Sequence, residues 1–156
     1  MKIKLLVVAK TSEVYLKTGI DYYCQKLSHY FPFEYMEIPA LKQTKNMTFE
    51  QQKVKEGEVI LSKIQPTDEV VLLDENGTTM TSLHFSQFLQ RHMQNAKQTV
   101  FVIGGPYGFS PAVYARQNFM LSLSSMTFSH QMVRLIFVEQ LYRAASILKN
   151  EPYHHE

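Results

Sequence analysis

The sequence has only one cysteine, Cys24. A single thiol excludes an internal disulfide and a cysteine-rich zinc site, and it is typical of proteins from a reducing cytosol. The sequence also lacks the His-Glu-x-x-His pattern that places two zinc ligands on one helix face. We therefore expect a cytoplasmic protein without a bound metal.

Long hydrophobic runs are also missing. The apolar run near the N-terminus, Leu5 to Ala9, is too short for the core of a signal peptide and lacks a cleavage region after it. No run approaches the about 18 apolar residues that a membrane-spanning helix needs. We expect the opening segment to be the first strand of a protein without a membrane partner.

The charge balance has no large excess of either sign. Sixteen basic and fourteen acidic residues give a formal net charge of +2, which neither requires nor excludes a nucleic-acid partner. A chain of 156 residues with 45% hydrophobic content can bury one sizeable core but is short for two. We predict a single domain over residues 1–156.

Strand and helix patterns alternate along the chain. Runs of β-favouring apolar residues predict strands, and apolar residues at helical spacing or cap signals predict helices. The expected strands are 2–9, 33–38, 69–74, 99–103 and 119–123, and the expected helices are 12–30, 48–64, 82–94, 111–116 and 130–148. The turn signal from Asp74 to Gly77 is expected to end the third strand. The alternation predicts an α/β fold with a mainly parallel sheet flanked by helices.

The last predicted helix, 130–148, is apolar on more than one face. A helix that is apolar over most of its circumference needs partners on more than one side. In so small a chain we expect a second copy to supply one of them, which predicts a homodimer.

The stretch from Phe101 to Ser110 joins an apolar strand to two glycines, Gly104 and Gly105. Ser110 before Pro111 is typical of a helix N-cap with proline at the first helical position. Open α/β sheets bind ligands at the carboxyl ends of their strands. A glycine pair after a strand is also found in simple tight turns, so the pattern by itself leaves both interpretations open.

Known nucleotide-binding and hydrolase motifs do not match this stretch. Its glycines lack the spacing of the dinucleotide fingerprint, no Gly-Lys-Ser/Thr follows, and no Gly-x-Ser-x-Gly elbow is present. The remaining possibility is a cradle of backbone groups built from the glycine loop and the Ser/Thr-rich loop 124–129. Such a cradle suits a flat, uncharged, polar-edged ring such as adenine, with Leu73 as apolar surface beside it. The polar loop from Lys42 to Asn46 is either solvated or a phosphate contact.

Four segments together resemble one known family, the ribosomal RNA large-subunit methyltransferase H family, whose members are minimal SPOUT methyltransferases. The resemblance covers essentially the whole chain and rests on segments 103–108, 121–130, 133–144 and 152–154. Two positions depart from the family pattern. Ser129 stands where the family usually has proline, and His155 stands where it usually has a basic residue.

The resemblance implies an S-adenosylmethionine-dependent enzyme. It implies methylation of N3 of a pseudouridine in 23S ribosomal RNA, on assembled ribosomes, by a homodimer. It also implies a C-terminal trefoil knot, a feature so rare that periodicity alone would not suggest it. Two rivals stay open: a non-catalytic RNA-binding module with the same scaffold, and a nucleotide-binding enzyme of another reaction.

Carried over by position, the resemblance assigns roles to residues of this chain. The cofactor would contact Leu73, Gly104, Leu123, Ser124, Ser125, Met126, Thr127 and Phe128. Tyr153 and His154 would approach the target base, with His154 either assisting loss of the N3 proton or binding the base edge. Apart from the resemblance, the preference of arginine for phosphate makes Arg134 and Arg143 candidates to anchor RNA phosphate, or alternatively to pair with Glu139 or cap a partner subunit.

Overall fold

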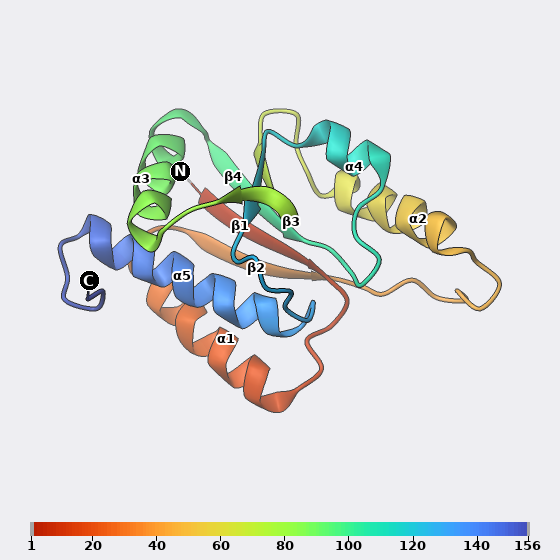
Figure 1. Cartoon of the computed structure of the whole chain (residues 1–156), viewed down its shortest axis with the longest axis horizontal. Coiled ribbons are helices and arrows are strands. Elements are labelled where there is room, and N and C mark those ends of the chain that lie inside the picture. The colour runs from red at the N-terminus through yellow and green to blue at the C-terminus, as the bar shows by residue number, and fades with distance from the viewer. Residues whose placement is uncertain (1, 156) are drawn as a thin grey trace.

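A computed structural model describes residues 2–155, which form one five-stranded sheet and its covering helices (Figure 1). All neighbouring strands are parallel, and their order is β2-β1-β4-β3-β5. The strands are β1 (Lys2–Val8), β2 (Phe33–Ile38), β3 (Glu69–Thr79), β4 (Gln98–Ile103) and β5 (Phe119–Ser122). The parallel α/β architecture expected from the sequence is confirmed. It follows from near-continuous apolar strands, which require cover on both faces.

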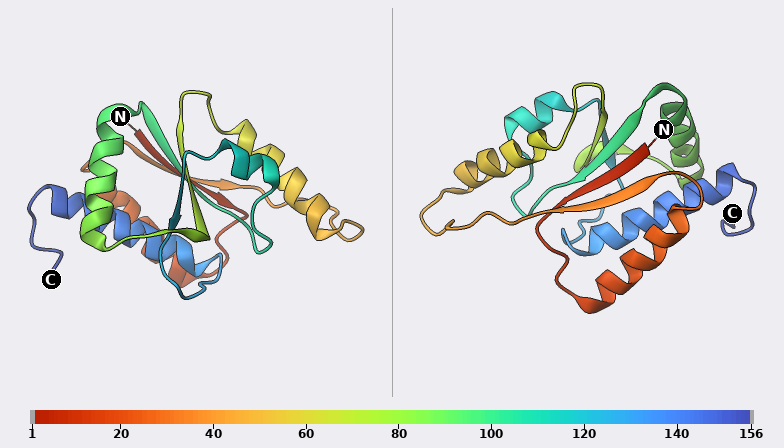
Figure 2. Two further views of the ribbon diagram at one scale, coloured as in Figure 1. Left: turned by 45° about the horizontal axis from the view of Figure 1, so that its top comes forward. Right: turned by 180° about the vertical axis from the view of Figure 1, so that it is seen from behind.

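The helices cover the two faces of the sheet as separate layers. On one face lie α1 (Val14–Leu27), α3 (Ser82–Asn95) and α5 (Met132–Leu148); on the other lie α2 (Phe49–Ser62) and α4 (Pro111–Arg116) (Figures 1 and 2). Alternate residues of a strand point to opposite faces, so Leu5 joins the core under the first layer and Leu6 the core under the second. None of the helices within residues 2–155 is both long and apolar enough to cross a membrane.

Local cap signals predicted two helix starts correctly. The Thr48 hydroxyl accepts a hydrogen bond from the Gln51 N–H at 3.1 Å, and the Gln51 side chain accepts one from the Thr48 N–H at 2.9 Å. This is the reciprocal capping box expected from the sequence. Ser110 caps α4 by accepting from the Val113 N–H at 3.3 Å, so the helix after the glycine loop begins where Ser110 and Pro111 predict.

The helix α5 finds its several apolar partners within its own chain. It lies over the sheet between α1 and α3 (Figure 1). Phe137 is fully buried, and a Cβ atom on Gly19 of α1 would lie only 2.9 Å from Leu135. Burial by α1, α3 and the sheet therefore accounts for much of the apolar surface of α5, while Ile136 and Leu148 stay partly exposed. The homodimer stays a prediction.

The third strand does not end at Asp74 as expected. The Asp74 carboxylate accepts from the Asn76 N–H at 2.9 Å, which is the local bond that the turn signal predicts. The strand nevertheless continues to Thr79, and its pairing with β5 shifts register between Leu73 and Thr78. The intervening residues bulge out of the ladder. Gly77 permits this because a Cβ atom there would lie 2.7 Å from the backbone of Met120.

The resemblance implies a trefoil knot in the C-terminal part of the chain, where β5, a loop and α5 follow one another. The structure places that loop at the carboxyl end of β5 and runs α5 back beneath the sheet (Figures 1 and 2). The arrangement of strands and helices agrees with the fold that the resemblance implies, while the knot itself stays a prediction.

Candidate functional site

A pocket opens where three neighbouring strands end. The pairing registers place Leu73 of β3 opposite both Ile103 of β4 and Leu121 of β5. Around this row the structure encloses a cavity of about 430 Å³, within the range of roughly 300–1,000 Å³ typical of small-molecule sites. The pocket lies at the sheet edge where open α/β folds bind ligands.

Two loops that follow different strands contribute to the pocket lining. One is the glycine loop from Gly104 to Gly108, and the other is the loop after β5, from Leu123 to His130. Of the predicted cofactor contacts, the structure brings these to the pocket: Leu73, Gly104, Leu123, Ser124, Met126, Thr127 and Phe128. Ser125 is exposed and lies outside the lining. The expectation that both loops form one cradle agrees with this arrangement.

The glycine loop is shaped by the absence of side chains. A Cβ atom at Gly104 would lie 3.0 Å from the ring of Phe109, which is itself buried and lines the pocket. Gly108 has a φ of +81°, a conformation that favours glycine, and its N–H donates to the carbonyl of Gly105 at 3.2 Å. The loop therefore closes tightly above the end of β4.

The second loop is held by its own serine hydroxyl groups. Ser122 donates to the Ser124 carbonyl at 3.0 Å, and the Ser124 hydroxyl accepts from the Met126 N–H at 3.0 Å. The Ser129 hydroxyl accepts from the Met132 N–H at 3.0 Å. Ser129, which departs from the family pattern, thus caps the first turn of α5.

The polar residues of the lining that were not expected from the sequence include Asp74, Glu75 and Tyr114. The Tyr114 hydroxyl donates to the Asp74 carboxylate at 2.5 Å. Burial and the neighbouring Asp74 carboxylate raise the pKa of Tyr114 to about 12. The carboxylates of Asp74 and Glu75 make this side of the pocket negatively charged. Asp74 and Glu75 lie in the irregular part of β3, and their sequence signal indicated only a turn.

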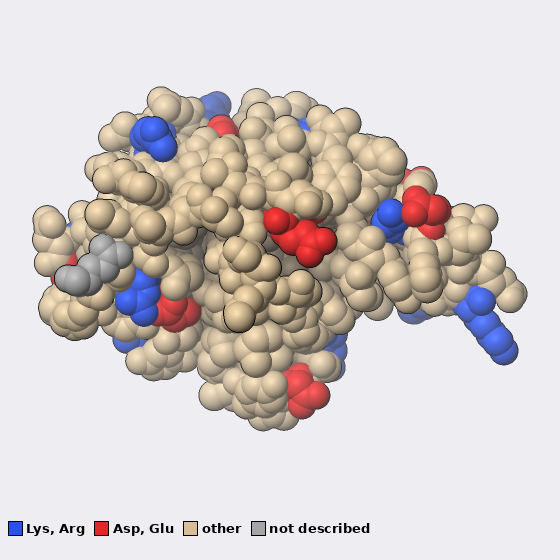
Figure 3. Space-filling view, viewed as in Figure 1, with Lys and Arg blue, Asp and Glu red and all other residues tan. Residues whose placement is uncertain are grey.

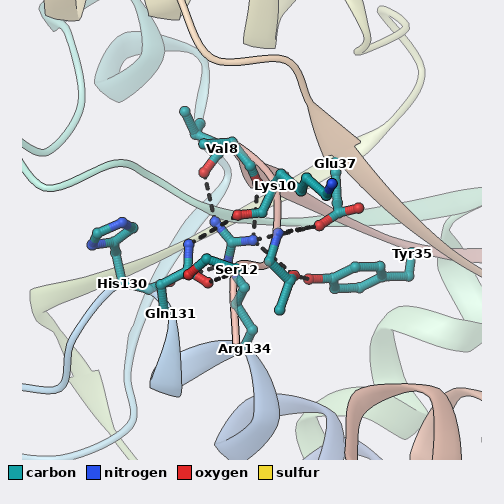
Figure 4. A network of polar contacts seen from close by, with 10 residues as sticks. Val8, Lys10, Ser12, Tyr35, Glu37, His130, Gln131 and Arg134 are labelled. Atoms are coloured by element: carbon teal, nitrogen blue, oxygen red, sulfur yellow. Dashed lines mark hydrogen bonds and ion pairs between the residues drawn. The ribbon is translucent and has the colours of Figure 1, made fainter. Parts of the chain in front are cut away.

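Arg134 at the start of α5 is the centre of a buried polar network (Figure 4). Its guanidinium donates to the carbonyls of Val8 at 2.6 Å and Ala9 at 2.9 Å, and to the Thr11 hydroxyl at 3.0 Å. It also donates to the carbonyl of His130 at 3.1 Å. The prediction that Arg134 contacts RNA is therefore wrong, because its side chain is fully buried and occupied with backbone acceptors.

The network holds the backbone of His130 in place, and His130 is part of the pocket lining. Burial, and secondly the positive charge of Arg134, lower the pKa of His130. Sequence spacing could not identify this residue, because the histidine has no motif of its own. Within residues 2–155, no group of three or more His, Cys, Asp or Glu side chains is arranged to hold a metal ion.

The C-terminal tail folds back on the other end of α5. The Tyr153 hydroxyl donates to the Glu139 carboxylate at 2.8 Å, and its ring lies 4.7 Å from that of Tyr142. Arg143 forms an ion pair with Glu139 at 2.5 Å and contacts Nδ1 of His154 at 3.2 Å. Of the open alternatives for Arg143, the pairing with Glu139 is the one that the structure contains.

The tail and the loop after β5 lie at opposite ends of α5 (Figure 1). This helix has 17 residues, or a length of about 25 Å at about 1.5 Å per residue. His130 lies before its first turn and contributes to the pocket, whereas Arg143 and His154 meet near its last turn. Within one chain, the structure therefore does not bring Tyr153 and His154 to the predicted cofactor contacts.

Comparisons with known proteins agree with this architecture over the whole chain. A family model described as "Predicted SPOUT methyltransferase" matches residues 1–154. The chain is 55% identical over 157 aligned residues to ribosomal RNA large subunit methyltransferase H of Parabacteroides distasonis, covering 100% of both chains. It is 57% identical over 156 residues to the protein of that name from Christiangramia forsetii, covering 99% of both.

A relative of the same name from Flavobacterium psychrophilum is 57% identical over 157 residues, again with 100% of both chains covered. Full-length matches at this level leave no segment of the sheet or of either pocket loop outside the similarity. The chain is therefore an enzyme of the SPOUT methyltransferases and belongs to their ribosomal RNA large-subunit methyltransferase H family.

Proposed function

We propose that the chain uses S-adenosylmethionine to methylate 23S ribosomal RNA at N3 of a pseudouridine, in the cytoplasm and on assembled ribosomes. The observation that carries the proposal is the pocket at the ends of β3, β4 and β5, formed by the two loops expected to hold the cofactor. The names of the full-length relatives supply the substrate class, because each is called a ribosomal RNA large subunit methyltransferase.

The pocket's chemistry fits S-adenosylmethionine. Leu73, Leu121 and Val133 offer apolar surface for the adenine ring, and the glycine loop brings bare backbone close to the same space. Asp74 and Glu75 are acidic, which complements the positive sulfonium and ammonium groups of the cofactor. When bound, S-adenosylmethionine supplies an already activated methyl group.

The residues of the chain then mainly have to orient the methyl donor and the acceptor base and to enclose them. Methyl transfer is an in-line displacement, so its rate depends on holding donor and acceptor in a near-attack geometry. Phe109 is buried behind the glycine loop and gives the pocket a rigid apolar wall. N3 of the target base must lose its proton, and His154 is the proposed residue that binds that edge or accepts the proton.

A homodimer explains how the tail takes part. In one chain the length of α5 separates His154 from the pocket by far more than a hydrogen bond. A second copy packed in the opposite sense would present its tail at the first copy's pocket, so that each site combines residues of both. Tyr153 and Glu139 already hold the tail in a defined conformation, which favours a shared site over a freely moving tail.

On the face in Figure 3, the charge distribution favours recognition of an assembled surface over general attraction to RNA. On the face in Figure 3, lysine and arginine side chains are scattered among acidic and neutral ones and form no broad basic field. Affinity from phosphate contacts grows with the number of basic residues that reach the backbone. Scattered charge therefore suits a target whose shape is presented by the ribosome.

Labelled S-adenosylmethionine tests the proposal directly. The protein is incubated with ribosomes that lack the modification and, separately, with free ribosomal RNA. Label should appear at one pseudouridine of 23S RNA in ribosomes and be weak in free RNA, with N3 identified by mass spectrometry of the isolated nucleoside. Labelling of neither RNA would reject the assignment, and labelling of free RNA alone would reject the ribosomal substrate.

Mixed dimers test the shared site. One chain carries His154→Ala and the other carries Gly104→Val, and each variant alone is expected to be nearly inactive. A dimer of the two holds one site with both an intact pocket and an intact tail. Co-purified mixed dimers should therefore regain a substantial fraction of turnover, whereas sites built within single chains would regain none.

A further inference from the structure

We infer that α2 acts as a clamp on the outside of the glycine loop, and that Glu56 is the positioning residue that sets the cofactor-binding geometry of Gly104 and Gly105. This inference rests on the proposed function, because it assigns a role in holding the methyl donor. The clamp consists of three contacts between α2 and the segment 104–110.

The first contact is a hydrogen bond to the loop backbone. Glu56 Oε1 accepts from the Gly105 N–H at 3.4 Å. Within residues 2–155 the structure gives Glu56 no ion pair, and burial raises the pKa of its carboxyl group, partly offset by the Gly105 bond. A half-buried carboxylate without a cation carries a desolvation cost, and in return it provides a strong acceptor for the loop.

The second contact is a stacked pair of aromatic rings. Phe49, the first residue of α2, stacks on Tyr107 with 4.1 Å between the ring centroids and 20° between the ring planes. Tyr107 belongs to the pocket lining, whereas Phe49 does not. The first turn of α2 thus holds the tip of the loop without entering the cofactor site.

The third contact is the close approach of α2 to the end of the loop. A Cβ atom on Gly57 would lie 2.4 Å from the Ser110 hydroxyl, the same hydroxyl that caps α4. Only glycine lets the helix and this cap lie so close together. The three contacts therefore hold the loop at its start, its tip and its end.

The three contacts lie on the side of the glycine loop that faces α2, whereas the loop also lines the pocket. A Cβ atom at Gly105 would point toward the Glu56 carboxylate, at 3.1 Å, while Gly104, Gly105 and Tyr107 contribute to the pocket. A loop with two adjacent glycines has few side chains to fix its backbone. Contacts from α2 supply that restraint from behind, so the loop is pre-organised before the cofactor binds.

Substitutions of Glu56 separate this role from a general structural one. Glu56→Ala removes the acceptor, Glu56→Gln keeps a side-chain oxygen in the same place, and Glu58→Ala changes an exposed glutamate of the same helix. Calorimetry with S-adenosylmethionine should give about tenfold weaker binding for Glu56→Ala, equivalent to about 1.4 kcal/mol. Affinity should return to near the wild-type value in Glu56→Gln and stay unchanged in Glu58→Ala. Wild-type affinity in Glu56→Ala, or no rescue by Glu56→Gln, would overturn the inference.

Hydrogen exchange keeps the test independent of activity. In the absence of cofactor, the Gly105 amide should exchange about tenfold faster in Glu56→Ala than in the wild type, while amides of β1 keep their rates. If wild-type protein does not bind S-adenosylmethionine, the proposed function fails, and the exchange result still decides on the clamp. Should Glu56→Ala not fold, Phe49→Ala serves as the second variant, with accelerated exchange at residues 105–108 expected and unchanged exchange contradicting the clamp.

Discussion

The guanidinium of Arg134 on α5 donates a 2.9 Å hydrogen bond to the carbonyl oxygen of Ala9, 125 residues earlier in the chain. Ala9 follows β1 with a φ of +73°, which is rare for a residue with a side chain. The same guanidinium binds the carbonyl of His130 at the pocket. One buried side chain therefore fixes the end of β1, the start of α5 and one wall of the pocket.

Removal of Arg134 should destabilise the protein strongly. Arg134→Ala leaves the carbonyls of Val8 and Ala9 without their donor and should lower the free energy of unfolding by about 2–4 kcal/mol. The free energy of unfolding of Arg134→Lys should lie between those of the wild type and Arg134→Ala, because one ammonium group cannot reach all the acceptors. Urea unfolding measures both, with Arg91→Ala, at an exposed arginine of α3, as a control expected within about 0.5 kcal/mol of wild type.

Gly104→Val should abolish cofactor binding while leaving the fold intact. Even a single Cβ atom there approaches Phe109 to 3.0 Å, and the branched side chain must displace either that ring or the loop. Calorimetry with S-adenosylmethionine should detect no binding for Gly104→Val and a smaller loss for Gly104→Ala. Equal affinity in wild type and Gly104→Val would refute the role of this loop.

His154→Ala should separate binding from turnover. His154 lies beside Arg143 at the far end of α5 from the pocket of its own chain, so its loss should leave the cofactor affinity unchanged. Turnover on ribosomes should fall by about 10²–10⁴-fold if His154 moves the N3 proton. A decrease confined to the KM for ribosomes would instead indicate a binding contact.

The stability of the protein should fall as the pH falls below about 6.5. Because the pKa of His130 is lowered in the folded state, the unfolded chain takes up a proton first, and protonation favours unfolding until the pH passes below the folded pKa. His130→Gln should therefore lose less stability than wild type between pH 7.5 and pH 5. Urea midpoints at the two pH values measure the difference, and parallel losses in both proteins would contradict the assigned shift.

Cys24 should resist alkylation in the folded protein. Burial, and secondly the charge of Asp21, raise its pKa to about 12, so at pH 8 it holds roughly a thousandfold less thiolate than an ordinary cysteine. Iodoacetamide should modify it quickly only after unfolding in urea. Rapid modification of the native protein at pH 8 would show that the thiol is more acidic and more accessible than this environment predicts.

Sequence patterns placed the elements that frame the site. The capping box at Thr48 and the cap at Ser110 depend on residues within one helical turn. Both helix starts can therefore be predicted from a few neighbouring residues. Apolar strands followed by glycines or serines predicted both loops of the pocket. The family resemblance added the chemical role of those loops, which backbone patterns cannot supply.

Contacts between distant segments decided the rest. The sequence favours an RNA contact for Arg134, whereas in the structure the end of β1 supplies its acceptors. The sequence likewise does not show that α1 and α3 cover much of α5. The same holds for Asp74, which meets Tyr114 at the pocket across 40 residues, and for Glu56, which contacts Gly105 across 49 residues. Local patterns were enough to predict most of the strands, the helices and the caps at Thr48 and Ser110, because these depend on neighbouring residues. The extension of β3, the burial of side chains and their meeting at the pocket depend on contacts between distant segments, which tertiary packing alone creates.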